Sequence, residues 1–170
     1  SHYTEFLSVE QRGAVATEVP ANEDDVITAD GFRAKIEELV EKNGEPPKLA
    51  MVDHFDYTLC NEHEAKAIGD VLNEYGIPFL YNGAYTVGIM PVDGRKIGAD
   101  FIVGSGHKSM ASPAPTGILA IRDGWQEKVL STTEIEGDLT GRTFGVKEIQ
   151  MLGCTVMGAP LMAMMASFPQ

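Results

Sequence analysis

The sequence predicts an α/β fold, a three-layer αβα arrangement around a mostly parallel sheet. Short apolar segments alternate along the chain with longer segments of helical periodicity, which is the pattern of βαβ units. The apolar segments also lack polar–apolar alternation, as expected of strands whose sheet is covered on both faces. In such sheets ligands bind beyond the carboxyl ends of the strands.

Three helices are expected. In residues 29–42 the apolar side chains fall on one face, Thr28 can cap the first turn, and Asn43-Gly44 can end the helix. A second helix is expected from Asn61 to Gly76, opened by a variant capping box of Asn61 and Glu64. A final helix is expected to begin near Thr155.

Strands are expected where apolar residues run between turn signals. The clearest βαβ unit lies in residues 48–82. Residues 131–147 are polar and glycine-rich, so they form either an excursion over the surface or a lid. The expected strands cover residues 14–19, 49–52, 77–81, 99–103 and 117–121.

Composition limits the function classes. The 170 residues are 44% hydrophobic, which suits one soluble domain, and no apolar run is long enough to span a membrane. Two cysteines cannot form a disulfide scaffold, and no signal peptide is recognised, so a cytoplasmic location is expected. A net charge of −12 is unusual for a nucleic-acid binder, so any RNA contact must be local or supplied elsewhere.

The segment Gly104-Ser105-Gly106-His107-Lys108-Ser109 follows the expected strand 99–103. Three interpretations compete for Lys108. It is a solvated loop lysine, the lysine of a phosphate-binding P-loop, or a lysine that holds the aldehyde of pyridoxal phosphate (PLP). The P-loop pattern fails because His107 replaces its glycine and the spacing differs.

Several separated motifs decide between these interpretations. They are Asn82-Gly83-Ala84-Tyr85, residues 98–110, Leu152-Gly153-Cys154-Thr155 and residues 165–169. Together, and in this order, they resemble the archaeal O-phosphoseryl-tRNA:cysteinyl-tRNA synthases, which are fold-type I PLP enzymes related to cysteine desulfurases. The resemblance implies PLP as cofactor and phosphoseryl-tRNA(Cys) as substrate, converted to cysteinyl-tRNA(Cys) by phosphate elimination and sulfur addition. It also implies a homodimer and allows phosphoseryl-tRNA synthetase as a partner; the sulfur donor stays open.

The resemblance assigns roles to residues near the cofactor. Lys108 would form the Schiff base and take the α-proton. Asn82 would face the pyridine nitrogen, where related enzymes usually place aspartate, so the electron sink should be weaker. Ser105 and His107 would bind the cofactor phosphate, and Tyr85 would belong to the cofactor-binding set.

Further residues are implied at the edges of the site. His2 would stack on the PLP ring, and Thr155 at a helix start would add a phosphate donor, reaching the other subunit's site. Thr58 stands where the family has an asparagine near the phenolic oxygen. Cys154, also at this helix start, is expected to relay sulfur as a thiolate. No metal is expected.

The chain also departs from the family. It is much shorter than family members, so residues 1–170 are expected to be part of the PLP-binding large domain, without an N-terminal segment and a C-terminal small domain. Met157 replaces an arginine of some relatives, and Cys60 matches no family cysteine. Two alternatives therefore stay open. One is a cysteine desulfurase or lyase acting on a free amino acid, and the other is a non-catalytic remnant that binds a partner.

Overall fold

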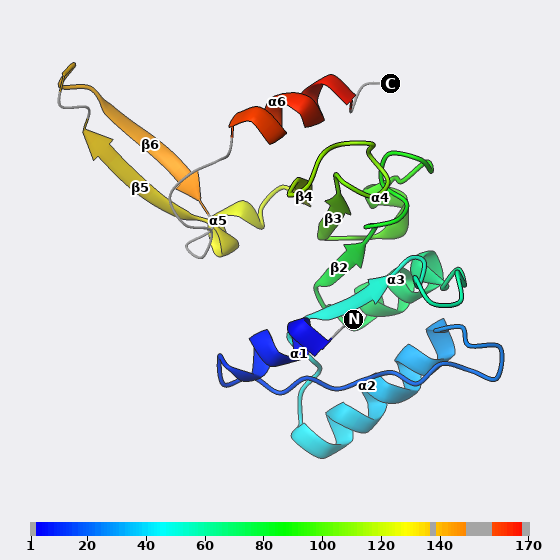
Figure 1. Cartoon of the computed structure of the whole chain (residues 1–170). Helices are drawn as coiled ribbons and strands as arrows, with labels where there is room; N and C mark the ends of the chain where they lie inside the picture. Colours follow the sequence, from blue (N-terminus) through cyan, green and yellow to red (C-terminus); the bar gives the residue numbers. More distant parts are fainter. Residues whose placement is uncertain (1–2, 137–138, 149–157, 168–170) are drawn as a thin grey trace.

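The chain is described here by a computed structural model that covers residues 3–136, 139–148 and 158–167. Helices and strands alternate through most of this length (Figure 1). The helices are α1 (Tyr3–Glu10), α2 (Ala29–Asn43), α3 (Ala65–Glu74), α4 (Gly94–Ile97), α5 (Gln126–Val129) and α6 (Gly158–Ser167). The strands are β1 (Ala50–Asp53), β2 (Phe79–Asn82), β3 (Phe101–Ser105), β4 (Gly117–Ile121), β5 (Ser131–Glu136) and β6 (Thr143–Glu148).

The central sheet has four strands in the order β1-β2-β3-β4. The first three are parallel, and β4 pairs antiparallel with β3. The predicted α/β class and mostly parallel sheet are therefore confirmed. Asp53 and Asn82 are register partners at the carboxyl ends of β1 and β2, so this edge of the sheet gathers polar side chains from neighbouring strands.

The capping of α2 follows the local sequence. The Thr28 side chain accepts a hydrogen bond from the Gly31 N–H at 3.1 Å, which satisfies one of the free donors of the first turn. Gly44 closes the helix in the left-handed region at φ 78°, and its N–H donates to the Val40 carbonyl. Both ends of this helix were predicted correctly.

The start of α3 corrects the sequence prediction. Glu64 is the N-cap residue, but its side chain makes no capping hydrogen bond to α3. Instead, its Oε2 accepts from the N–H of Ala29, the first residue of α2, at 2.9 Å. Asn61 donates to the carbonyls of Asp24 and Asp25. The predicted capping box is therefore wrong, because both side chains bind partners far away in the sequence.

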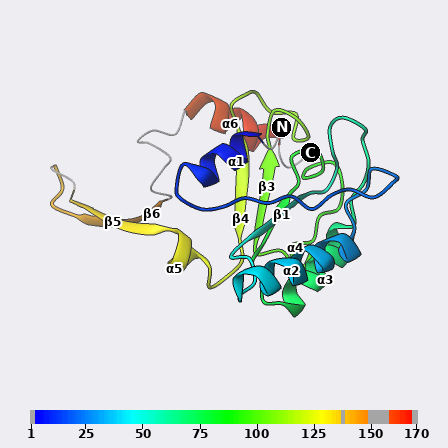
Figure 2. The same cartoon turned by 90° about the horizontal axis from the view of Figure 1, so that it is seen from below.

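Two other expectations change. Residues 14–19 form no strand and pair with none of the described strands, and Val15 is 92% exposed. Residues 131–147 fall within the antiparallel β5–β6 hairpin, which extends away from the sheet in both Figure 1 and Figure 2. The final helix, α6, begins at Gly158, and the expected start near Thr155 lies outside the described residues.

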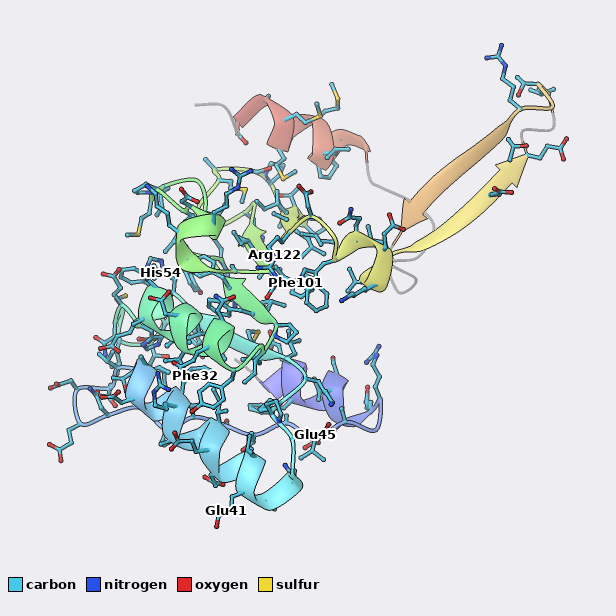
Figure 3. The ribbon with its side chains drawn as sticks, turned by 180° about the vertical axis from the view of Figure 1, so that it is seen from behind. Phe32, Glu41, Glu45, His54, Phe101 and Arg122 are labelled. Atoms are coloured by element: carbon cyan, nitrogen blue, oxygen red, sulfur yellow. The ribbon has the colours of Figure 1, made fainter. Side chains whose placement is uncertain are left out.

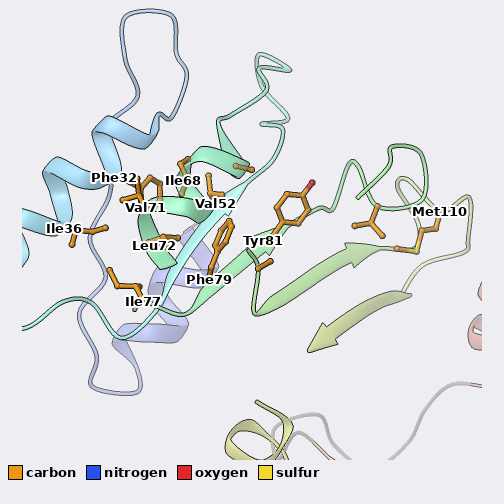
Figure 4. Packing of buried hydrophobic residues seen from close by; sticks show 13 residues of the cluster. Phe32, Ile36, Val52, Ile68, Val71, Leu72, Ile77, Phe79, Tyr81 and Met110 are labelled. Carbon is orange, nitrogen blue, oxygen red and sulfur yellow. The ribbon is translucent and has the colours of Figure 1, made fainter. Parts of the chain in front are cut away.

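The core lies where α3 packs against β1 and β2 (Figure 4). Phe79 and Tyr81 from β2 and Ile68 and Leu72 from α3 are fully buried. Phe32 on α2 extends this cluster, and Figure 2 shows α2, α3 and α4 gathered together, apart from α1 and α6. An Arg33–Glu74 ion pair, at 2.7 Å, further links α2 to the end of α3. None of the described helices has the length and apolar character needed to cross a membrane.

Gly69 is required for the approach of α3 to α4. A Cβ at this position would overlap the carbonyl oxygen of Ile97. Alanine is the better helix former by about 1 kcal/mol, yet we expect Gly69→Ala to destabilise the fold by roughly 1–3 kcal/mol through overpacking. The measurement is the thermal unfolding midpoint of the full-length product of the gene that encodes this chain.

Gly158→Ala is the matched control for this substitution. Gly158 also lies in a helix, but in the part of the chain that the structure describes, no heavy atom beyond its neighbours and its own helix backbone lies within 4 Å of its added Cβ. The Gly158 variant should therefore unfold at the same temperature as the unchanged protein or slightly higher. Equal effects of the two substitutions would contradict the packing argument.

Candidate active site

A pocket of about 500 Å³ lies at the carboxyl ends of β1, β2 and β3. This is the edge at which the fold class predicts a ligand. The lining combines apolar walls with a few polar groups, as small-molecule sites do. The lining residues are Glu5, Asp53, Phe55, Tyr57, Asn82, Ala84, Tyr85, Val103 and Lys108.

The ends of β1 and β2 place an amide and a carboxylate in contact. The Nδ2 atom of Asn82 donates to Oδ1 of Asp53 at 2.6 Å, and its Oδ1 accepts from the Ala84 N–H at 3.1 Å. The strand pairing continues beyond this point, because the His54 N–H donates to the Asn82 carbonyl at 3.0 Å. Asn82 is therefore held from both its backbone and its side chain.

Lys108 lies in the turn after β3 and faces an aromatic ring. Its Nζ is 4.3 Å from the centroid of the Tyr85 ring, a cation–π contact. Lys108 is exposed, so burial among the described residues does not desolvate its amine. The structure therefore gives this amine a neighbouring ring but no burial.

A serine next to Lys108 ties the lysine turn to the turn that carries Tyr85. The hydroxyl of Ser109 donates to the carbonyls of Val87 and Ala84. Gly83 allows the second turn to pack closely, because a Cβ there would come within 2.5 Å of Val87 and 2.8 Å of Tyr81. The relative positions of Lys108 and Tyr85 therefore depend on the backbone of both turns.

Ser105 and His107 lie together beside the pocket. The Ser105 hydroxyl and His107 Nδ1 are 3.2 Å apart, and His107 is exposed. Neither residue lines the pocket itself. Hydroxyl and imidazole groups at this spacing can both donate to one phosphate, as the sequence prediction requires.

The loop after β1 is organised by Asp56. Its carboxylate accepts from the N–H groups of Thr58, Leu59 and Asn61 at 2.8, 2.6 and 3.0 Å. These hydrogen bonds, led by the one from Leu59, hold the pKa of Asp56 below its usual value. The loop directs Tyr57 into the pocket lining, whereas the predicted Thr58 is exposed and outside it.

A second group of polar side chains surrounds His54, which is labelled in Figure 3. The His54 ring lies 2.6 Å from the Tyr81 hydroxyl and 2.9 Å from Glu62 Oε1. The same hydroxyl is 3.1 Å from Thr86 Oγ1, and burial raises the pKa of Tyr81. This chain of contacts links the residue after β1 to Tyr81 in β2 and to Thr86 in the turn that follows β2.

A family model identifies the family to which this fold belongs. The model described as Aminotransferase class-V matches residues 6–154. The chain belongs to the aminotransferase class-V family. This family implies dependence on PLP, which agrees with the cofactor expected from the motifs around Lys108.

Curated proteins narrow the similarity within the aminotransferase class-V family. The chain is 61% identical over 169 residues to O-phospho-L-seryl-tRNA:Cys-tRNA synthase 1 of Methanococcoides burtonii. It is 61% identical over 170 residues to O-phospho-L-seryl-tRNA:Cys-tRNA synthase 2 of Methanospirillum hungatei JF-1. The matches cover 99% and 100% of this chain but 37% of each relative. The resemblance inferred from the motifs is thereby confirmed.

Solved structures agree with this placement. A crystal structure of a SepCysS–SepCysE N-terminal domain complex matches with a TM-score of 0.84 and 43% identity, covering 99% of this chain and 44% of that one. An apo cysteine desulfurase from Thermococcus onnurineus NA1 matches with a TM-score of 0.74 and 21% identity, covering 99% and 42%. The second match supports the fold alone.

The pocket brings together only part of the predicted site. Asn82, Tyr85 and Lys108 line it, and Ser105 and His107 lie beside it. His2, Cys154 and Thr155 lie outside the described residues. Cys60 is an exposed free thiol in the loop after β1. Among the described residues, no three potential metal ligands gather in one place.

Sequence reasoning missed several lining residues. Asp53 was the easiest of them to predict from the sequence, because it ends β1 just as Asn82 ends β2. Phe55 and Tyr57 follow in the same loop, where no periodicity distinguishes inward from outward side chains. Glu5 reaches the lining from α1, a helix that the sequence analysis did not predict.

We expect Asp56→Ala to release the loop after β1. Because the pKa of Asp56 is lower in the folded chain, the stabilisation by its carboxylate is complete above the ordinary carboxyl pKa. It is lost as the pH falls through the lowered value. At neutral pH, the amides of Leu59 and Asn61 should therefore exchange hydrogen several-fold faster in the variant, as measured by hydrogen–deuterium exchange.

Asp70→Ala, which removes an exposed carboxylate on α3, is the control for this measurement. It should leave exchange at Leu59 and Asn61 unchanged. Unaltered exchange in the Asp56 variant would show that the loop is held by other contacts.

Proposed function

We propose that this chain is part of the large domain of a PLP-dependent enzyme that converts O-phosphoseryl-tRNA(Cys) to cysteinyl-tRNA(Cys). The observation that carries the proposal is the pocket in which the amine of Lys108, the ring of Tyr85 and the amide of Asn82 meet at the carboxyl edge of the sheet. The identity of about 61% to synthases of this name supports the choice of reaction.

The lining of the pocket fits PLP. A phosphorylated pyridine aldehyde needs an amine for its aldehyde, a hydrogen-bonding group for its ring nitrogen and flat or aliphatic surfaces for its ring. Lys108 and Asn82 meet the first two needs, and the side chains of Phe55, Ala84 and Val103 offer the surfaces. Ser105 and His107 would bind the phosphate from beside the pocket.

When bound, PLP supplies an electron sink that acidifies the α-carbon of the attached amino acid. Lys108 then has two tasks, since its Nζ holds the cofactor before the substrate arrives and afterwards takes the α-proton. The Tyr85 ring keeps this amine over the pocket while it is unattached. Removal of the α-proton by Lys108 would permit the loss of phosphate from the neighbouring carbon, and a sulfur nucleophile would then add at that carbon.

The remaining roles belong to the same proposal. Cys154 would carry sulfur toward the site, Thr155 would bind phosphate, Thr58 would approach the phenolic oxygen, and His2 would stack on the ring. Because the chain spans 37% of the curated relatives' length, further segments would complete the domain and add a small C-terminal domain.

The proposed partners complete the assembly. A homodimer in the cytoplasm would be the working form, with phosphoseryl-tRNA synthetase as a possible supplier of substrate. A SepCysE-type protein is a further candidate, because a related structure is a complex with such a domain. With a net charge of −12, this chain would need basic surface from other segments or proteins to hold tRNA.

The test combines cofactor trapping with product analysis in the full-length gene product. PLP should become fixed to Lys108 after borohydride reduction, as shown by peptide mass mapping. Lys108→Ala should abolish this adduct and lower phosphate release from phosphoseryl-tRNA at least about 100-fold, because both attachment and proton transfer are lost. Lys66→Ala, on the exposed face of α3, should change neither.

The other outcomes identify the alternatives. Release of sulfur from free cysteine, without phosphate release from phosphoseryl-tRNA, would indicate a desulfurase. Absence of any adduct dependent on Lys108 would contradict an enzymatic role for this pocket.

A further inference from the structure

We propose that Asp53 keeps the ring nitrogen of the cofactor protonated by acting through Asn82. This inference rests on the proposed function, because it concerns how this chain treats PLP bound in the pocket. The sequence alone predicts a weak electron sink, since the residue facing the ring nitrogen is a neutral asparagine. The structure adds a carboxylate directly behind that asparagine.

The orientation of the Asn82 amide is fixed by its neighbours. The Ala84 backbone N–H can only donate, so the atom that it contacts at 3.1 Å must be the amide oxygen. The NH₂ group therefore faces Asp53, whose Oδ1 accepts from it at 2.6 Å. In a flipped amide, the Asn82 oxygen would face the Asp53 carboxylate, and the Asn82 NH₂ group would face the Ala84 N–H. Both contacts would be repulsive.

The contact changes what Asn82 offers to a ring nitrogen. Its oxygen keeps a second lone pair that can accept from a protonated ring, and its NH₂ group keeps a second hydrogen that can donate to a neutral one. Hydrogen bonding to a carboxylate draws electron density toward the amide oxygen, and the negative charge of Asp53 attracts a positive ring. Both effects favour the protonated ring.

The backbone holds this pair in place. Asp53 and Asn82 are paired residues of parallel strands, and the next hydrogen bond of the ladder joins the His54 N–H to the Asn82 carbonyl. On the other side, the Gly83 N–H donates to the Val103 carbonyl at 2.9 Å. Asp53 is therefore a positioning residue, and the strand pairing fixes the position of its carboxylate relative to the Asn82 amide.

Other titratable groups also face the pocket and must be separated from this effect. They are Glu5 from α1, Tyr57 from the loop after β1, Tyr85, and Lys108 itself. Glu5 is the other carboxylate in the lining, so Glu5→Gln tests whether any negative charge in the pocket acts equally. The direct contact with Asn82 predicts that Asp53 dominates.

The experiment follows the ring nitrogen directly in the full-length gene product. The protein is loaded with PLP labelled with ¹⁵N in the ring, and the ¹⁵N chemical shift is measured by NMR as a function of pH. The midpoint in the unchanged protein should lie above that of PLP attached to a lysine analogue in solution. Asp53→Asn should lower the midpoint by about one pH unit, which makes the protonated ring about tenfold rarer relative to the neutral one.

The variants separate charge from shape. Exchanging the two residues, in the double variant Asp53→Asn/Asn82→Asp, keeps a carboxylate–amide pair and should restore a protonated ring at neutral pH. Glu5→Gln should shift the midpoint less than Asp53→Asn, and Asp70→Asn, which removes an exposed charge on α3, should not shift it.

Each result supports or overturns the inference. An Asp53→Asn midpoint equal to that of the unchanged protein overturns it, while PLP attached to Lys108 leaves the proposed function standing. If Asp53→Asn does not fold, the unchanged protein decides, because a ring nitrogen that is neutral at pH 7 overturns the inference. Absence of PLP on Lys108 overturns both the proposed function and this inference.

Discussion

The parallel register of β1, β2 and β3 is the constraint on which the site depends. Parallel strands end at one edge, so Asp53, Asn82 and the turn after β3 meet there although they are far apart in the sequence. Backbone hydrogen bonds continue beyond the last paired residues and fix the strand ends. A slip of one residue in β2 would turn Asn82 to the opposite face and separate it from Asp53.

Features that depend on nearby residues could be read from the sequence. The cap of α2 involves Thr28 and Gly31, and its end involves Gly44, so neither needs tertiary structure. Asn82 and Lys108 could also be predicted as site residues from the sequence. Each lies at the end of, or shortly after, an apolar segment that the sequence predicts to be a buried strand. The βαβ pattern predicts parallel strands, and parallel strands end at the same edge of the sheet, so the two residues were expected to lie at one pocket.

Features that depend on distant partners were not readable. Glu64 precedes α3 in the pattern of a capping box, yet it binds the first residue of α2. Residues 14–19 have the composition of a strand but pair with none of the described strands, and composition alone does not decide such pairing. The contact between Asp53 and Asn82 belongs to this class, since it requires the register of two strands. The inward direction of Tyr57 depends on the Asp56 hydrogen bonds that shape its loop.

The exposure of Lys108 bears on how the site would work. A lysine amine loses its proton more readily when it is desolvated or placed near other cations. In the described residues, the Lys108 amine is exposed and lies over the face of the Tyr85 ring in a cation–π contact. Asn82 has two fixed polar contacts, to Asp53 and to the Ala84 N–H. The exposed side chain of Lys108, which under the proposed function attaches and releases the cofactor, lies instead on a turn.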